Sequence, residues 1–447
     1  QVFPKPAGID SQYYSGDHAD IKLVTKPESL YHDNAGGITM FEVDPQQKGY
    51  LYLAIDSLFY HSPDGGEKWN RTGLKGRIHH IYASPSEAEN AVYVFSENEM
   101  AIFDKKSGEF RYQNYPEGMS PVTSFAAGKQ KNSSTNIFYA VHHTSPKEND
   151  FVFSNSEIWT SPDNGRTWNK VEDPVMSNKI SGSLPSIVKV VCSENDAANA
   201  YVICNNYEEK KSGKTVIWYG ALKTGNSGGE WKWVWKGGGG SGRYGVKDAG
   251  DAENLKDAWV KQAFGNEFIQ LIDVGVSPVD GKLAIVTDWY RTMKTTDGGD
   301  TWNEIYSRSN PDGSFTSRGM DVTTTYGVHQ DPFDSMHVAV SYTDIGFHHS
   351  FDGGKSWIRS VDGVPNDWVN TCYWLVFDPA VKNKLYSVWS GNHDMPRGKM
   401  TRNPKWKEEG YAKGGVCVSS DGGKTWTASS EGMGTNSIAT SIVIDPS

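Results

Sequence analysis

Short apolar runs separated by turn-forming residues recur along most of the chain. The first set predicts strands at 37–45, 50–55, 58–62 and 69–72, which we name A, B, C and D. Similar sets begin near residues 78, 122, 186, 268, 321 and 371. Strands of about four to eight residues, repeated every ~40 to 60 residues, fit a propeller better than a sandwich. The pattern therefore predicts an all-β fold: a seven-bladed β-propeller of four-stranded antiparallel blades.

An eight-residue motif, Ser/Thr-x-Asp-x-Gly-x-x-Trp, lies between strands C and D of five units. Its copies occupy 62–69, 161–168, 295–302, 350–357 and 419–426. Degenerate versions occupy 105–110 and 225–231. We expect each copy to form a hairpin turn. In that turn the Asp accepts backbone N–H groups, a Gly adopts a positive φ, and the Trp packs beside the next strand.

This motif resembles the Asp box, or BNR repeat, of sialidases, Asp-box xyloglucanases and sortilin-type receptors, all of which are β-propellers. The box is a structural staple in those families, so the resemblance implies a fold and leaves the activity open. A sialidase is disfavoured, because that family carries an early Arg-Ile-Pro segment and this chain contains none.

Two regions depart from the repeat. Residues 1–36 are polar and irregular and are predicted to form an N-terminal extension, with the propeller occupying 37–447. An insertion at 236–266 begins with a Gly-rich, flexible stretch and continues with a short helix predicted at 251–264. Near the other end, 437–446 is predicted to form one more A strand. That strand either closes the ring against the N-terminal strand or begins an eighth unit.

The composition narrows the function. The net charge of −10 argues against nucleic acid as the main partner, and no apolar run is long enough to span a membrane. The chain begins at Gln1 without Met and carries sequons at Asn70 and Asn132, so we expect a secreted protein. The four Cys are candidates for disulfides, with buried free thiols as the alternative. The candidate pairs are Cys192 with Cys204 and Cys372 with Cys417.

Propeller geometry predicts which end of the blades carries a site. The A–B and C–D turns emerge on one face of such a blade, and the B–C and D–A turns emerge on the other. The Asp boxes are C–D turns, and the resemblance to Asp-box enzymes implies that ligands bind on the opposite face. We therefore consider the B–C breaks, two of which are predicted at 142–143 and 205–206, because polar groups from several blades converge there on one channel mouth.

Glycoside hydrolysis requires two carboxyl groups, one as acid and one as base or nucleophile. The segment 343–346, Thr-Asp-Ile-Gly, resembles the segment that carries a catalytic Asp in Asp-box xyloglucanases, which implies that role for Asp344. Asp56 and Asp288 lie at other B–C breaks and are its candidate partners. Asp394 is another carboxylate on this face and a substrate-binding candidate, and Trp289 and Tyr290 could stack on sugar rings. Tyr373 and Trp374 of a strand A either stack on sugar rings as well or fill the core.

A polysaccharide lyase needs other groups: one neutralises the uronate carboxylate, one removes the C5 proton and one protonates the leaving oxygen. Tyr, His and Arg fill these roles, and in this the rim is similar to the propeller-fold ulvan and rhamnose–glucuronate lyases. The catalytic candidates for this chemistry are His143, Tyr290 and Arg291. The substrate-binding candidates are His142, His80, His393, Arg397 and Tyr326. Adjacent residues of a strand point to opposite faces, so at most one histidine of the 142–143 pair faces the site.

The sequence therefore predicts a secreted enzyme that degrades a polysaccharide or oligosaccharide, as a glycoside hydrolase first and a polysaccharide lyase second. A third reading is a non-enzymatic propeller that binds a glycan or a protein. No metal and no cofactor are expected, because no His/Asp spacing demands a metal and no Gly-rich phosphate loop is present. We expect a monomer.

Overall fold

The computed structural model divides the chain into two compact units, and each is described by itself. The first unit comprises residues 1–256, 266–289 and 293–303, and the second comprises 257–265, 290–292 and 304–447. The structure describes residues 13–15, 22–24, 38–85, 89–145, 154–177, 184–211, 213–240, 254–256, 259–260, 270–288, 290–319, 324–393, 413–433 and 438–445.

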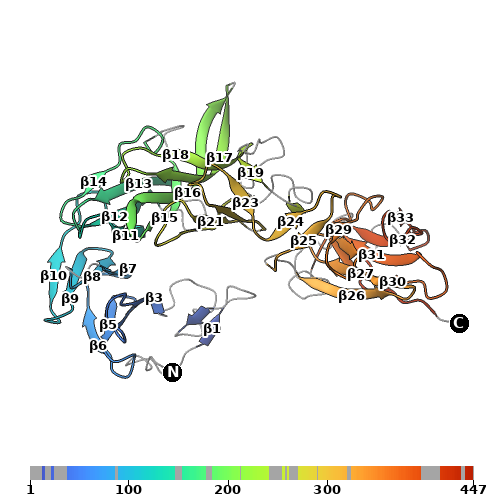
Figure 1. Ribbon diagram of the computed structural model, residues 1–447, viewed down its shortest axis with the longest axis horizontal. Helices are drawn as coiled ribbons and strands as arrows, with labels where there is room; N and C mark the ends of the chain where they lie inside the picture. The colour runs from blue at the N-terminus through green and yellow to red at the C-terminus, as the bar shows by residue number, and fades with distance from the viewer. Residues whose placement is uncertain are drawn as a thin grey trace. The chain divides into compact units, whose positions relative to one another are not determined.

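The first unit contains four sheets of four antiparallel strands each, and in every sheet the strands follow chain order (Figure 1). Blade one is β3 (Ile38–Val43), β4 (Leu51–Ile55), β5 (Leu58–Ser62) and β6 (Asn70–Gly73). Blade two is β7 (Ile78–Ala83), β8 (Ala91–Ser96), β9 (Met100–Asp104) and β10 (Phe110–Gln113). Blade three is β11 (Val122–Lys129), β12 (Asn136–Ser145), β13 (Ser154–Ser161) and β14 (Asn169–Lys170). Blade four is β15 (Ser186–Ser193), β16 (Asp196–Lys211), β17 (Lys214–Thr224) and β18 (Lys232–Gly240).

Three further sheets complete the set. Blade five, mainly in the first unit, is β20 (Asp273–Val276), β21 (Ala284–Thr287), β22 (Thr292–Thr295) and β23 (Trp302–Glu304), with β19 (Leu255–Lys256) parallel to β23. Blade six is β26 (Thr325–Asp331), β27 (Asp334–Tyr342), β28 (Phe347–Ser350) and β29 (Ile358–Arg359). Blade seven is β30 (Thr371–Phe377), β31 (Leu385–Ser390), β32 (Gly414–Ser419) and β33 (Thr427–Ala428). Two short pairs stand apart: β1 (Tyr13–Ser15) with β2 (Lys22–Val24), and β24 (Ser307–Ser309) with β25 (Phe315–Ser317).

The predicted fold class is confirmed. The described residues hold seven consecutive sheets that each contain four antiparallel strands in chain order, as many as the sequence predicts. This sheet is the blade of a β-propeller. The hydrophobic core lies between neighbouring blades: one buried cluster joins residues of blades one and two, and another joins residues of blades six and seven. These clusters therefore bury the facing sides of the two blades that they join.

Three local predictions are wrong. The chain does not turn at Asn206, because this residue adopts φ 67° in a bulge and β16 continues beyond it. Residues 236–240, predicted to be flexible, belong to β18 and pair with β17. Residues 438–445 form no strand, so the predicted last A strand is absent from them. The helix predicted at 251–264 lies mostly outside the described residues; of those described, β19 is a strand and residues 259–260 are helical.

The Asp boxes have the hydrogen bonds that their sequence predicts. In the box of blade seven, the Ser419 hydroxyl donates to Asp421 Oδ1 (2.8 Å) and accepts the N–H of Gly423 (2.8 Å). Asp421 also accepts the N–H (3.0 Å) and the hydroxyl (2.7 Å) of Thr425. The Trp426 ring is 3% exposed, and its N–H donates across to the carbonyl of Ser360 in blade six (3.0 Å). This box therefore closes its own turn and places its tryptophan against the core.

We expect Asp421→Ala to lower the free energy of unfolding by about 2 kcal/mol, because several hydrogen bonds of the turn lose their acceptor. Partial burial raises the pKa of Asp421, but the hydrogen bonds from Thr425 and Ser419 outweigh it and hold the pKa at about 2. The stabilisation is therefore complete above pH ~4 and is lost as the pH falls toward about 2. Urea unfolding of both proteins from pH 7 to pH 2 measures it. A difference that does not shrink toward pH 2 would contradict this assignment.

Blade two has lost its box and has a buried ion pair nearby. Lys105, within the degenerate box, places its amino group 2.9 Å from Asp44 Oδ2 of blade one, and both side chains are fully buried. Asp44 also accepts the Tyr52 hydroxyl (2.7 Å) and the backbone N–H groups of Gln46 and Gln47 (2.9 Å each). The carboxylate therefore has a partner for each of its oxygens, and the pair fastens blade two to blade one.

All four cysteines are buried free thiols, so neither candidate disulfide forms. Cys192 is 8% exposed, and Cys204, Cys372 and Cys417 are 0% exposed. Burial raises the pKa of each thiol, to about 12 for Cys417. These side chains fill core positions as small hydrophobic groups.

Candidate functional site

Three predicted carboxylates follow the second strand of their blades, as the sequence predicts. Asp56 lies between β4 and β5 at φ 53° and is exposed. Its carbonyl accepts the N–H of Ile78 (2.8 Å), which fixes the start of blade two. Asp288 directly follows β21 and is 7% exposed. Asp344 lies between β27 and β28 and is half-buried. Asp56 and Asp288 belong to the first unit and Asp344 to the second.

The turn that carries Asp344 is fixed by its backbone. Asp344 adopts φ 64°, a left-handed conformation that Asp and Asn tolerate better than most residues. The N–H of Tyr342 donates to the carbonyl of Gly346 (2.8 Å), which closes the turn. The N–H of Thr343 donates to the carbonyl of Thr324 (3.0 Å), directly before β26. The carboxylate therefore stands at the start of the first strand of its blade.

Residues of blade seven also contact the turn that carries Asp344. Gly346 forms a parallel bridge with Thr371, the first residue of β30, at φ 76°. A Cβ at Gly346 would lie 2.8 Å from the carbonyl oxygen of Val369, so a side chain does not fit there. The Nε of Arg359, in β29, donates to the carbonyl of Ile345 (3.0 Å). Asp344 is thus presented on a rigid support between blades six and seven.

Aromatic and polar groups gather at this same end of blades six and seven. Tyr326 of β26 and Tyr373 of β30 pack with ring centroids 4.9 Å apart. The hydroxyl of Tyr373, which is 3% exposed, donates to the carbonyl of Asn392 (2.7 Å), next to His393. Tyr326 and His393 are half-buried. Asp344, Tyr326, Tyr373 and His393 are therefore the predicted residues that the second unit brings to one rim.

The histidine pair of blade three lies inside a strand. β12 continues to Ser145, so the B–C break predicted at 142–143 is wrong. His142 Nδ1 lies 2.9 Å from the carbonyl oxygen of Pro121, and His143 Nε2 lies 2.7 Å from that of Ile187. The two rings thus point to opposite sides, as the alternation of a strand requires. Burial lowers the pKa of His143, which keeps its ring neutral at neutral pH. These contacts favour a packing role.

The remaining candidates are more scattered. His80 lies in β7 with its ring 6.1 Å from Phe125, and burial lowers its pKa to about 4. Arg291 is 4% exposed and Tyr290 is half-buried, both directly before β22. Trp289, Asp394 and Arg397 lie outside the described residues. Their assignments as substrate-binding residues stay predictions.

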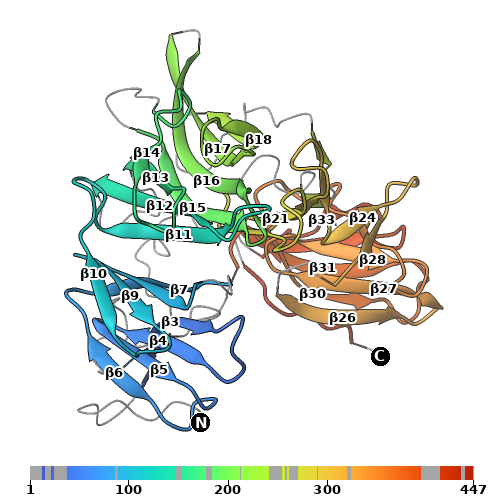
Figure 2. The ribbon, with the colours of Figure 1, turned by 60° about the vertical axis from the view of Figure 1, so that its left-hand side comes forward.

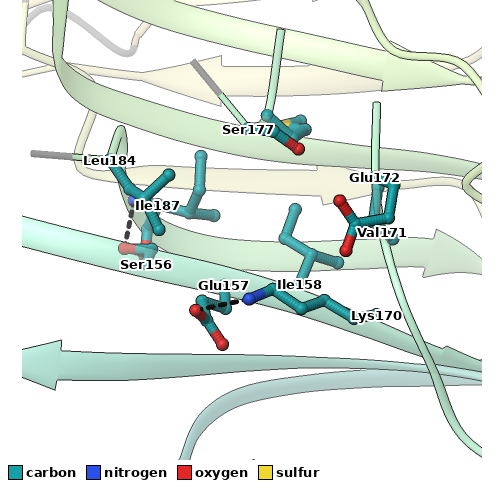
Figure 3. Close-up of a pocket in the computed structure, with 10 residues that line it drawn as sticks. Ser156, Glu157, Ile158, Lys170, Val171, Glu172, Ser177, Leu184 and Ile187 are labelled. Atoms are coloured by element: carbon teal, nitrogen blue, oxygen red, sulfur yellow. Dashed lines mark hydrogen bonds and ion pairs between the residues drawn. The ribbon is translucent and has the colours of Figure 1, made fainter. Parts of the chain in front are cut away.

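A cavity of about 100 Å³ opens between blades three and four, at the end of β13 opposite its Asp box (Figure 3). The Oε1 of Glu157 accepts the Lys170 amino group (2.6 Å), and the exposed Glu172 lies on another side of the cavity. The Ser156 hydroxyl accepts the N–H of Ile187 (2.7 Å). The cavity is smaller than the ~300 Å³ at which ligand pockets usually begin, so it admits a small group only. Its lining residues are Ser156, Glu157, Ile158, Lys170, Val171, Glu172, Met176, Ser177, Leu184 and Ile187.

Sequence reasoning missed the two carboxylates of this cavity. Both lie away from the B–C breaks, since Glu157 lies inside β13 and Glu172 follows β14. The opposite charges of Glu157 and Lys170 were a weak signal, since Lys170 pairs with Trp159, two residues along β13 from Glu157. Nothing in the sequence places Ile187 beside them. Within the described residues, no group of three or more His, Cys, Asp or Glu could hold a metal ion. No helix of the described part of the chain is long and apolar enough to cross a membrane.

Comparison with known proteins gives structural likeness only. No protein-family model and no curated protein matches the sequence. The GH74 xyloglucanase from Xanthomonas campestris is 12% identical, with a TM-score of 0.41, and the match covers 91% of this chain and 66% of that chain. YCF48 from Cyanidioschyzon merolae is 13% identical, with a TM-score of 0.35 and coverage of 79% and 92%. The Cps50 (Swd1) β-propeller domain from Myceliophteria thermophila is 9% identical, with a TM-score of 0.36 and coverage of 79% and 94%.

This chain thus spans just under two thirds of the first xyloglucanase that it resembles. At these identities and TM-scores, the likeness leaves the activity and the substrate open. Any function must therefore be argued from the residues of this chain.

Proposed function

We propose that this protein is a secreted, monomeric glycoside hydrolase that cleaves a polysaccharide and uses Asp344 as one of its two catalytic carboxyl groups. The observation that carries the proposal is the turn at 343–346. A half-buried carboxylate is held there in a left-handed conformation by backbone contacts to two blades. Catalytic groups need such rigid placement, because a small displacement lowers the rate strongly.

The chemistry assigned to Asp344 is proton transfer at the glycosidic bond. One carboxyl group protonates the leaving oxygen while the other activates water or attacks the anomeric carbon. Asp56 and Asp288 are the proposed partners, since both follow the second strand of a blade as Asp344 does. Tyr326 is half-buried beside this rim, where its ring can stack on a sugar.

The lyase alternative has less support. The candidate base for removing the C5 proton is His143. Its Nε2 lies 2.7 Å from a backbone carbonyl oxygen, and the residue is 5% exposed. A ring in that position has little access to a substrate. Tyr290 and Arg291 remain candidates for such chemistry, and the experiment below tests for it.

The test is incubation of the protein with neutral and uronate-bearing plant and algal polysaccharides. We expect reducing ends to appear without any rise in ultraviolet absorbance, since hydrolysis creates no double bond. Absorbance of unsaturated uronates would instead identify a lyase. Release of neither product from any substrate of the panel would contradict both enzymatic readings and support a binding protein.

A further inference from the structure

Blade four carries an extension beyond its four-stranded core. β16 has 16 residues and β17 has 11, whereas β4 and β5 of blade one have 5 each. After the bulge at Asn206, residues Tyr207–Lys211 continue as a strand that pairs with Lys214–Trp218. Figure 2 shows this hairpin rising beyond the rest of the sheet. It extends from the end that carries the B–C turns, which is the face predicted to meet a ligand.

Three aromatic rings lie on one side of this extension. Tyr207 of β16 is directly opposite Trp218 of β17, so their side chains share a face. Trp233 of β18 is opposite Leu222, which lies on that same face of β17. The Tyr207 and Trp233 rings meet edge to face at 5.1 Å. All three rings are half-buried, so each keeps part of its surface in solvent.

Two charged groups fix the orientation of these rings. The Trp218 N–H donates to Glu209 Oε2 (2.7 Å). The Lys236 amino group lies 4.4 Å from the Trp218 ring centroid and 5.2 Å from that of Trp233. It is also 3.6 Å from Glu209 Oε2. The side chains of Lys236 and Glu209 are 28% and 47% exposed, so both retain hydrogen-bonding capacity toward solvent.

The cluster lies close to the cavity of blades three and four. Tyr207 and Trp233 pack against the buried cluster that contains Ile158, Met176 and Ile187, and these three residues also line the cavity. The extension and the cavity therefore adjoin the same buried cluster. Neither the Asp box nor the rim at Asp344 uses any of these groups.

We propose that Tyr207, Trp218 and Trp233, with Glu209 and Lys236, form an aromatic platform that binds sugar rings of the polysaccharide. This rests on the function proposed above and assigns to blade four a second contact with the same substrate. Sugars have apolar C–H faces that stack on aromatic rings and equatorial hydroxyls that hydrogen-bond at the edge. Glu209 and Lys236 supply an acceptor and a donor there.

The charge of the platform favours a neutral glycan over other partners. Its one cation and one anion lie within ion-pair distance, so it carries no net charge to attract nucleic acid or a peptide of one sign. A purely structural cluster would bury its rings, and these stay partly exposed. Rings whose orientation is fixed in advance also lose little conformational entropy on binding.

The experiment is retention of purified protein on cellulose, immobilised xyloglucan and polygalacturonate, measured at 4 °C. Binding needs no turnover, so it can be scored whether or not hydrolysis is found. We expect the native chain to bind at least one neutral glycan and Trp218→Ala to weaken that binding about tenfold. Trp218→Phe keeps a ring and should retain most of the affinity. The control is Tyr112→Ala, which removes a 55%-exposed aromatic from β10 and should bind like the native chain.

The binding results support or contradict the aromatic platform as follows. If the native chain binds none of the three glycans, or Trp218→Ala binds as well as Tyr112→Ala, the platform is overturned. If Trp218→Ala loses binding with an unchanged thermal midpoint, while no glycan is hydrolysed, the platform stands and the hydrolase proposal fails. Should Trp218→Ala unfold, Glu209→Ala tests the same site, because it removes the acceptor of the Trp218 N–H from a half-exposed position. Unaltered affinity in Glu209→Ala would then overturn the platform.

Discussion

Replacing Asp344 with Asn is expected to lower the rate of glycan cleavage by about 10²- to 10⁴-fold, the usual contribution of a general acid or base. The amide neither gives nor takes the proton that the carboxyl group transfers. The fold should survive, because Asn adopts the left-handed conformation of this position as readily as Asp. The change therefore removes the chemistry and keeps the turn.

Reducing-end release and the thermal midpoint measure these two effects separately. The matched control is Asp334→Asn, an exposed turn residue at the other end of β27 that accepts the N–H of Met336 (2.9 Å). This control should cleave glycan at the native rate. Cleavage by Asp344→Asn within about threefold of native, at an unchanged midpoint, would rule out a general acid or base at this position.

The largest effect on stability is expected from Lys105→Met. It leaves the buried carboxylate of Asp44 without its cation, and breaking a buried pair in this way destabilises by about 3–5 kcal/mol. Burial raises the pKa of Asp44, but the hydrogen bonds from Lys105, Tyr52 and two backbone N–H groups outweigh it and hold the pKa below its usual range. In the native chain this stabilisation is present above pH ~4 and is lost as the pH falls below it.

Urea unfolding at pH 7 measures the loss in Lys105→Met. The adjacent Lys106 is exposed, so Lys106→Met is the matched control and should change stability by less than about 0.5 kcal/mol. The double variant Lys105→Met with Asp44→Asn should recover much of the loss, since no unpaired charge remains and the amide oxygen still accepts the N–H groups of Gln46 and Gln47. A loss below about 1 kcal/mol in Lys105→Met would mean that the pair behaves as a surface ion pair.

The strands of this fold follow from local sequence to a large extent. In blade one, the runs predicted at 50–55 and 58–62 differ by at most one residue at either end from β4 and β5. In both runs the apolar side chains alternate or are continuous over about five residues, and turn-forming residues lie at either end. The sequence pattern therefore agrees with the structure. The Asp-box turns could be predicted from the sequence equally well, because each turn is stabilised by its own side chains.

Predictions failed where distant segments decide the outcome. Asn205 and Asn206 look like a turn, but the cross-strand pairing of Tyr207 with Trp218 extends the strand through a bulge. The histidines of β12 look like rim residues, yet β12 continues to Ser145. Ile187 of the next blade lines the cavity near Glu157, and no local sequence pattern predicts that contact. Of the candidate site, sequence therefore located the turn of Asp344 and missed the acidic cavity.

The four buried thiols have a practical consequence. Since the native chain needs no disulfide and buries all four thiols, it can be produced in a reducing cytosol as well as in an oxidising compartment. In a variant with one cysteine introduced at an exposed position such as Tyr112, the new thiol would be the one exposed thiol of the folded protein. A fluorophore could then be coupled at that one position without any need to remove the natural cysteines.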